Sequence, residues 1–496
     1  MTESTLSAPA IPFQHSYTTL PDRLWVPVDP TPVSAPRLLV LNETLAHELG
    51  IATQLGSPLA PAMLAGNVLP PGAKPIALAY AGHQFAHFVP QLGDGRAILL
   101  GELRDVAGQR RDVQLKGAGP TPFSRGGDGR AAIGPVLREF LVSEAMHALG
   151  VPTTRSLAAV TTGEAVWREV PLPGAVLARV AASHLRVGTF QFAAARNDME
   201  SLRALTSYAL TRHYPDLADS ARPALALLRA VGERQAALVA SWMHVGFIHG
   251  VMNTDNSSIS GETLDYGPCA FLDEYDPGKV FSSIDRRGRY AFANQAVIAH
   301  WNLARLAECL LPLIDSDDDI ALDMADEAIS EFPLRFRQRW LDGMRAKLGL
   351  SSSEEGDEAL ANDLLTAMQA AGADYTVVFR SLSALAGDTG ASGNRGADLP
   401  SSADFDAWLA RWRERCARDP LASAGREAKM RATNPAVIPR NHLVEQALAS
   451  AAEGDLAPFH ALLAAVRRPF DDDAATRPYM QPPQPDQRVT RTFCGT

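Results

Sequence analysis

Residues 112–150 read DVQLKGAGPTPFSRGGDGRAAIGPVLREFLVSEAMHALG and fall into three parts of different character. The first part is a short β-rich run that ends at Lys116, and a glycine-rich stretch follows it. A helix is predicted at the end, because apolar residues recur along one helical face between Pro135 and Gly150. A strand, a loop and an amphipathic helix in this order predict a small sheet with one packed helix.

The residues on either side extend this pattern into an α+β chain. Further β-rich runs, RAILLGEL, RSLAAV, AVWREV and AVLARVA, predict a mostly antiparallel sheet between residues 96 and 180. Residues 1–80 are rich in proline and predict an irregular leader with one helix, in LVLNETLAHELG. Beyond about residue 195 the periodicity is helical, most clearly over 223–243, 295–313, 321–348, 358–372 and 403–417. Residues 351–358 and 386–404 read as exposed loops.

Length, charge and cysteine use narrow the functional classes. A chain of 496 residues predicts roughly two to four domains. Its net charge of -10 argues against a general binder of nucleic acid or anionic membranes, although a local basic pocket is compatible with it. The four cysteines form no CxxC pair, so neither a zinc cluster nor a dense disulfide framework is expected. We expect a soluble cytoplasmic protein, because the start lacks an apolar signal region and no run of about 18 apolar residues follows.

Two glycine-rich loops and a lysine are candidates for phosphate binding. Lys116 precedes Glu139 of the predicted helix by 23 residues, and in kinase-like folds such a glutamate holds the lysine that binds nucleotide phosphates. A solvated lysine and an exposed glutamate are the alternative. The loop that contains Asp128 and the loop LGDGR at 92–96 could cradle a polyphosphate, or could be a flexible surface loop and a tight hairpin turn. Neither loop matches a P-loop or Rossmann fingerprint.

The segment HGVMNTDNSSISGETLDYGPCAFLD, residues 249–273, has the composition of a catalytic loop. Asp255 could accept a proton from an attacking hydroxyl group, while Asn256 and Asp265 offer the hard oxygen ligands that Mg²⁺ or Mn²⁺ prefers. A set of Asn and Asp turn formers is the alternative interpretation. Arg179 and Arg186 could neutralise a triphosphate, although exposed arginines are common.

Together these stretches resemble the selenoprotein O family of kinase-like protein adenylyltransferases over nearly the whole chain. The motifs that carry the resemblance are YAGHQF, VPQLGDGRAILLGE, QLKGAGPTPFSRGGDGRAA, GVPTTR, HGVMNTDN, DYGPCAF and NPAVIPRNHLVEQAL. The resemblance implies an α+β, protein-kinase-like two-lobed fold with family-specific extensions. Its parts would be an N-terminal extension (1–80), a small sheet-plus-helix N-lobe (81–192), a larger, mainly helical C-lobe (193–470) and a tail (471–496).

The resemblance also implies an activity and a set of site residues. ATP, or alternatively UTP, would bind reversed relative to an ordinary kinase, so that AMP or UMP passes to Ser, Thr or Tyr of a target protein and pyrophosphate leaves. Asp255 matches the general base, Asn256 and Asp265 match the ligands of Mg²⁺ or Mn²⁺, and Glu139 matches the partner of the lysine. The positions that match nucleotide contacts are Gly93, Gly95, Arg96, Lys116, Asp128, Gly129, Arg179, Arg186 and Asp265.

Two other functions stay open from the sequence. An ordinary kinase would transfer the γ-phosphoryl group, but its catalytic loop separates Asp from Asn by four residues, whereas Asp255 and Asn256 are adjacent. A catalytically silent nucleotide-binding scaffold could instead sense redox state through Cys494, which stands where relatives carry selenocysteine or cysteine. A plain exposed thiol is the alternative for Cys494.

Overall fold

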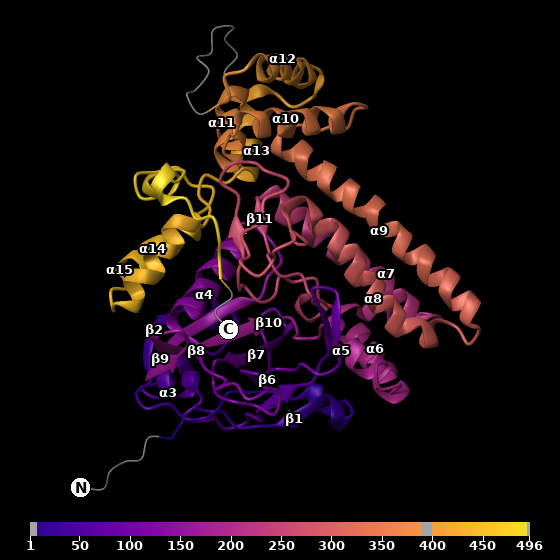
Figure 1. Ribbon diagram of the computed structural model, residues 1–496, viewed down its shortest axis with the longest axis vertical. Coiled ribbons are helices and arrows are strands. Elements are labelled where there is room, and N and C mark those ends of the chain that lie inside the picture. Colours follow the sequence, from indigo (N-terminus) through magenta and orange to yellow (C-terminus); the bar gives the residue numbers. More distant parts are fainter. Residues whose placement is uncertain (1–6, 388–398, 494–496) are drawn as a thin grey trace.

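The computed structural model describes residues 7–387 and 399–493. Figure 1 shows the sheet and its helix α4 at one end of the molecule and a layer of long helices beside them. Helices α10 to α13 lie at the opposite end from the sheet, and α14 and α15 run alongside α4. The sheet and the helical layer meet along one boundary, and the segment 249–273 lies there.

The sheet has eight strands, and each of its pairings is antiparallel, which confirms the predicted sheet type. Its order is β1 (Trp25–Pro27), β3 (Ile76–Leu78), β6 (Ala97–Arg104), β7 (Arg110–Lys116), β10 (Pro171–Ala181), β9 (Arg155–Trp167) and β2 (Arg37–Leu41), and β8 (Ala131–Ala132) pairs with β10. The run RSLAAV and the first three residues of AVWREV, predicted as two strands, belong to the single strand β9. Gly163, with φ of +73°, lies inside that strand.

The first 80 residues are more regular than the sequence predicted. They contribute β1, β2 and β3 to the sheet and form the helices α1 (Glu43–Glu48), α2 (Ala52–Leu55) and α3 (Ala60–Ala65). The predicted helix LVLNETLAHELG divides at Asn42, because the Asn42 side chain caps the helix by accepting a hydrogen bond from the backbone N–H of Leu45. The residues before this cap belong to β2.

Helix α4 (Ile133–Ala148) is buried on both sides. One side packs on β9 and β10, and the other packs against α14 (Asn441–Ala452) and α15 (Ala457–Val466) (Figure 1). The sequence predicted a single apolar face, because the helices that cover the second face lie about 300 residues further along the chain. Glu139 projects from this doubly supported helix.

The five helices predicted beyond residue 195 are all present, together with others that the periodicity did not single out. Helix α5 (Val187–Ala194) comes just before this part. The helices of this part are α14 and α15, given above, and α6 (Met199–His213), α7 (Pro223–His244), α8 (Gln295–Ile314), α9 (Asp318–Lys347), α10 (Asp357–Ala371), α11 (Tyr375–Gly387), α12 (Ala403–Arg418) and α13 (Ser423–Thr433). Within the described residues one helix, Phe292–Ile314, is long and apolar enough to cross a membrane, where no such segment was expected. It packs against α5, α7 and α9, and core helices have the same composition.

Two small hairpin-like pairs frame the boundary between sheet and helices. Strands β4 (Gly82–Gln84) and β5 (His87–Val89) form a hairpin whose turn residues, Phe85 and Ala86, both have left-handed backbone with φ of 49° and 68°. Strands β11 (Phe247–Ile248) and β12 (Ala270–Phe271) pair and so hold the two ends of the segment that carries Asp255 and Asp265. This pairing brings the ends of a long loop together at one place.

The last described residues fasten that segment. Thr492 is buried, its backbone N–H donates to the carbonyl of Phe281 over 2.8 Å, and its carbonyl accepts from the N–H of Ser283 over 2.9 Å. The Thr492 hydroxyl donates to the carbonyl of Pro268 over 2.6 Å, three residues after Asp265. The chain end therefore supports the loop that follows Asp265.

Candidate active site

A cavity of about 520 Å³ lies between the sheet and the segment 249–273. Residues from the glycine-rich loops, β7, β10 and that segment line it. The sequence-predicted residues among them are Gly93, Gly95, Arg96, Lys116, Asp128, Gly129, Arg179, Arg186, Asp255, Asn256 and Asp265. Glu139 does not line this cavity, because it stands behind Lys116.

Asp265 is the centre of a buried cluster of charges. Its Oδ1 accepts hydrogen bonds from Lys116 Nζ and Arg179 Nη1, each over 2.6 Å, and its Oδ2 accepts from Arg186 Nη1 over 2.8 Å. Burial by itself would raise the pKa of Asp265, but the three cations lower that pKa well below its usual range. Asp265 also has left-handed backbone, with φ of 64°, a conformation that costs a non-glycine residue energy and is frequent at functional sites.

Glu139 balances part of this positive charge from the other side. Lys116 Nζ donates to Glu139 Oε2 over 2.6 Å, and Arg179 Nη1 donates to Glu139 Oε1 over 3.2 Å. Arg179 faces Gln114 across the register of β10 and β7, and its Nη2 donates to the Gln114 side chain over 2.6 Å. Arg186 Nη2 also lies 3.8 Å from Asp94 Oδ1, so the three cations of this cluster face the carboxylates of Asp265, Glu139 and Asp94.

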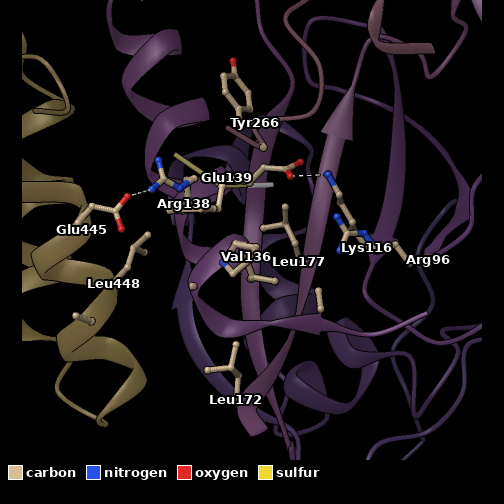
Figure 2. A pocket seen from close by; sticks show the side chains of 16 residues that line it. Arg96, Lys116, Val136, Arg138, Glu139, Leu172, Leu177, Tyr266, Glu445 and Leu448 are labelled. Atoms are coloured by element: carbon tan, nitrogen blue, oxygen red, sulfur yellow. Dashed lines mark hydrogen bonds and ion pairs between the residues drawn. The ribbon is translucent and has the colours of Figure 1, made fainter. Parts of the chain in front are cut away.

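Figure 2 shows a second cavity, of about 380 Å³, which adjoins the first at Arg96 and Lys116. Lys116 and Glu139 reach toward each other at one side of it. On the opposite side Arg138 pairs with Glu445 of α14, so the residue next to Glu139 ties α4 to α14. The remaining walls are mostly apolar and include Val136, Leu172, Leu177 and Leu448.

Asp255 lies in a short 3₁₀ turn, Thr254–Asn256, with its carboxyl group almost completely buried. Gln84 Nε2 donates to its Oδ2 over 3.4 Å, and its Oδ1 has no hydrogen-bond partner among the described residues. Burial raises the pKa of Asp255 to about 6, and this increase exceeds the lowering effect of the Arg186 charge. A carboxylate with a pKa near neutrality is suited to accept a proton.

A hydrogen bond from the side-chain amide of Asn256 fixes the orientation of that side chain. Its Nδ2 donates to the carbonyl oxygen of Val251 over 3.0 Å, so the amide oxygen is directed away from that bond. Asn256 and Asp265 line the same cavity and would offer a divalent cation two oxygen ligands. Within the described residues no group of three or more His, Cys, Asp and Glu side chains could hold a metal by itself. Phosphate or water oxygens would complete the coordination of a cation at Asn256 and Asp265.

The β4–β5 hairpin contacts Asp255 and its neighbours, and sequence reasoning assigned it no role in the site. The backbone N–H of His83 donates to Thr254 Oγ1 over 2.7 Å, and that of Phe85 donates to Asn253 Oδ1 over 3.0 Å. Gly82 lies so close that a Cβ atom there would stand 2.7 Å from Asp255 Oδ1. About 170 residues separate the two segments, so local sequence patterns contain no signal for these contacts.

The lining of the cavity is basic, although the chain as a whole has a negative net charge. Seven cationic side chains line the cavity against four carboxylates: Arg96, Lys116, Arg125, Arg130, Arg168, Arg179 and Arg186 against Asp94, Asp128, Asp255 and Asp265. Asp128 accepts hydrogen bonds from Arg168, and these bonds lower the pKa of Asp128. Arg168 lies in the turn between β9 and β10, where nothing in the sequence distinguishes it from other exposed arginines.

Gly129 allows the glycine-rich loop to close on itself. Its φ is 64°, and a Cβ atom there would stand 2.1 Å from the carbonyl carbon and oxygen of Gly119. We expect Gly129→Ala to open this loop and to raise KM for the nucleotide on the order of tenfold or more, since backbone atoms would have to move. Gly126→Ala is the matched control, because Gly126 also has positive φ but no atom within 4 Å of a Cβ. Equal KM values for the two variants would contradict this prediction.

Cys269, Cys309 and Cys416 are buried, whereas Cys494 lies outside the described residues. The predicted redox contact of Cys494 stays a prediction.

Comparison with known proteins identifies a family and several relatives that this chain is similar to. The family model of protein adenylyltransferase SelO matches residues 9–467. A protein nucleotidyltransferase YdiU of Rhizobium etli (strain CIAT 652) is 58% identical over 495 residues, which cover 100% of this chain and 99% of the relative. The protein nucleotidyltransferase YdiU of Agrobacterium fabrum is 58% identical over 487 residues, with 98% and 99% covered. That of Bradyrhizobium sp. (strain BTAi1) is 59% identical over 493 residues, with the same coverage.

Proposed function

This chain belongs to the SelO family of protein adenylyltransferases, and from that premise we propose how its cavity transfers AMP from ATP to Ser, Thr or Tyr hydroxyl groups of other proteins. The chain is a nucleotidyltransferase, and ATP is its substrate. The observation that carries the proposal is one cavity that contains both a buried carboxylate of raised pKa and a cluster of cations.

The phosphates are assigned to the cationic end of the cavity. Lys116, Arg179 and Arg186 would bind the β- and γ-phosphates, with the α-phosphate directed toward Asp255. The acceptor oxygen forms a bond to the α-phosphorus while its proton passes to Asp255. The bond from the α-phosphorus to the oxygen that bridges it to the β-phosphate breaks, and its electron pair leaves with pyrophosphate. The cations stabilise the charge that develops on this leaving group.

We propose Asn256 and Asp265 as the residues that hold the divalent cation. Their amide and carboxylate oxygens are the hard ligands that Mg²⁺ and Mn²⁺ prefer, and a bound cation would neutralise phosphate charge during the transfer. Asp265 would then exchange part of its bonding to Lys116, Arg179 and Arg186 for the metal. Those three cations would turn to the phosphates.

We also propose the two-lobed, protein-kinase-like organisation for this fold. The sheet with α4 would form the small lobe over 81–192, and the helices would form the large lobe over 193–470. The extension 1–80 would add β1, β2 and β3 to the small lobe, and the tail 471–496 would return to the loop after Asp265. Lys116 on a strand and Glu139 on the packed helix support this interpretation.

The experiment that tests the function uses ATP labelled at the α- or the γ-phosphate. Purified protein with Mg²⁺ or Mn²⁺ and a cell extract should transfer α-label, but not γ-label, to extract proteins. Asp255→Ala serves as the control and should transfer neither label. Transfer of γ-label would assign phosphoryl transfer instead, and α-labelled UTP in the same assay measures whether UMP is also transferred.

The pKa of Asp255 predicts the pH dependence of the reaction. A general base must be deprotonated, so we expect the rate at saturating ATP to fall about tenfold for each pH unit below about 6. The hydrogen bond from Gln84 lowers the pKa of Asp255. Gln84→Leu should therefore move the midpoint of the pH profile to higher pH. An unchanged midpoint in that variant would argue that another group controls the profile.

A further inference from the structure

Backbone covers Asp255 on two sides. A Cβ atom on Gly82 would stand 2.7 Å from Asp255 Oδ1, and one on Gly188 would stand 3.3 Å from Asp255 Cα and 2.2 Å from the Ala81 carbonyl oxygen. An acceptor hydroxyl group therefore has to approach through the cavity. With the phosphates at Lys116, the lining residues available to the acceptor include Gln84, Phe85, Asn253, Asn256 and Ile284.

Ile284 begins a loop, residues 284–290, that is fixed beside the catalytic segment. Tyr290 Oη donates to Asn253 Oδ1 over 2.7 Å, and the ring of Tyr290 lies 5.1 Å from that of Phe85 at the hairpin tip. Asp285 is buried, and its carboxylate accepts from the backbone N–H groups of Arg289 and Tyr290 over 2.9 and 2.8 Å. These hydrogen bonds and the ring contact hold the loop in place at the rim of the cavity.

This rim presents an apolar side chain next to unpaired positive charges. Ile284 lines the cavity, yet half of its surface is exposed. Arg286 and Arg287 are exposed, and neither takes part in an ion pair with any described residue. The charge of Asp285 is directed inward, so it does not present its carboxylate to solvent beside these guanidinium groups. Arg286 and Arg287 follow the cavity-lining Ile284 by two and three residues, so this loop adds positive charge beside the cavity of a chain whose net charge is -10.

We infer that the acceptor segment of a target protein docks on the surface formed by Phe85, Ile284, Arg286 and Arg287, and that it carries acidic side chains close to the modified hydroxyl group. An apolar residue of the acceptor would lie on Phe85 and Ile284, while its carboxylates would face Arg286 and Arg287. Complementary charge of this kind speeds encounter and fixes the register of the bound segment. This inference rests on the proposed function and names the class of acceptor.

The test uses three sets of peptides, each with a central Tyr, Ser or Thr as the acceptor. The residues that flank the acceptor are Glu in the first set, Gln in the second and Lys in the third. With α-labelled ATP, the wild-type protein should show kcat/KM for the Glu peptides on the order of tenfold above that for the Lys peptides, mainly through KM. The double variant Arg286→Glu, Arg287→Glu should remove or reverse this preference, with KM for ATP unchanged. Raising the salt concentration should reduce the preference.

The matched control is the double variant Arg37→Glu, Arg413→Glu. Both arginines are exposed and unpaired with any described residue, and the change in net charge is the same. This control should keep the preference for Glu peptides. Equal rates for the three sets, no labelling of the Glu peptides, or a control that behaves like the Arg286 and Arg287 variant would overturn the inference. Transfer of α-label to extract proteins in parallel reports the proposed function separately.

Discussion

Replacing Asp265 with alanine is expected to abolish AMP transfer and to lower the free energy of unfolding by about 3–5 kcal/mol. The Asp265 carboxylate is the shared partner of Lys116, Arg179 and Arg186, of which the two arginines are almost fully buried. Without it, Glu139 would be the remaining carboxylate partner of Lys116 and Arg179, and Arg186 would keep only its longer contact with Asp94. The variant also loses a proposed metal ligand, so the loss of activity should persist at saturating ATP.

Inorganic triphosphate separates the electrostatic part of this effect from a general loss of packing. An added polyanion should raise the Tm of Asp265→Ala by more than that of the wild type, because it replaces the missing negative charge. Asp128→Ala is the control, since the Asp128 carboxylate pairs with Arg168 at the exposed rim of the cavity. Its loss should lower the free energy of unfolding by less than about 1 kcal/mol. A Tm gain no larger than that of the wild type would refute the electrostatic explanation.

Asp255→Asn should lower the rate of AMP transfer by about 10²–10⁴ and yet make the protein more stable above pH 7. The folded pKa of about 6 lies above the usual value, so ionising this buried carboxyl group costs stability as pH rises from about 4 to above 6. A shift of about two units corresponds to roughly 3 kcal/mol at most, which a neutral amide of the same shape would avoid. Affinity for ATP should change little.

Thermal unfolding at pH 5 and pH 8 measures this effect. The increase in Tm that Asp255→Asn causes should appear at pH 8 and be small at pH 5. Asp112→Asn is the control, and its effect on stability should have the opposite sign. Burial opposes ionisation of Asp112, but the Arg212 charge and the hydrogen bonds from His184 lower the pKa of Asp112 to about 2. The ionised Asp112 therefore stabilises the fold above pH 4, and its variant should lose stability at pH 8. A destabilised Asp255→Asn at pH 8 would show that the carboxylate has a partner in solution.

Local patterns in the sequence were enough to predict the long strands of the sheet and most of the long helices. The strand that ends at Lys116 and the helix that carries Glu139 have clear boundary signals, and the two residues lie only 23 positions apart. Short strands were missed because three to five residues contain little periodicity, as in β1, β2 and β3. The leader consequently read as irregular.

The candidate site was predictable only in part, for a related reason. Residue types and the family motifs named Arg179, Arg186 and Asp265, but their common ion-pair cluster depends on the register of β10 against β7. The support that the β4–β5 hairpin gives to Asp255 depends on packing between segments far apart in the chain. No pattern within a single segment encodes such contacts, and only the folded arrangement reveals them.

The contact between Thr492 and Pro268 joins the loop after Asp265 to a segment that is synthesised much later. A ribosome makes the chain from its N-terminus, so residues 255–283 leave the exit tunnel about 200 residues before Thr492 does. Until the final residues arrive, the loop after Asp265 lacks these hydrogen bonds and the surface of α4 lacks α14 and α15. A chain that is clipped before Thr492 therefore lacks the hydrogen bonds that hold the loop after Asp265.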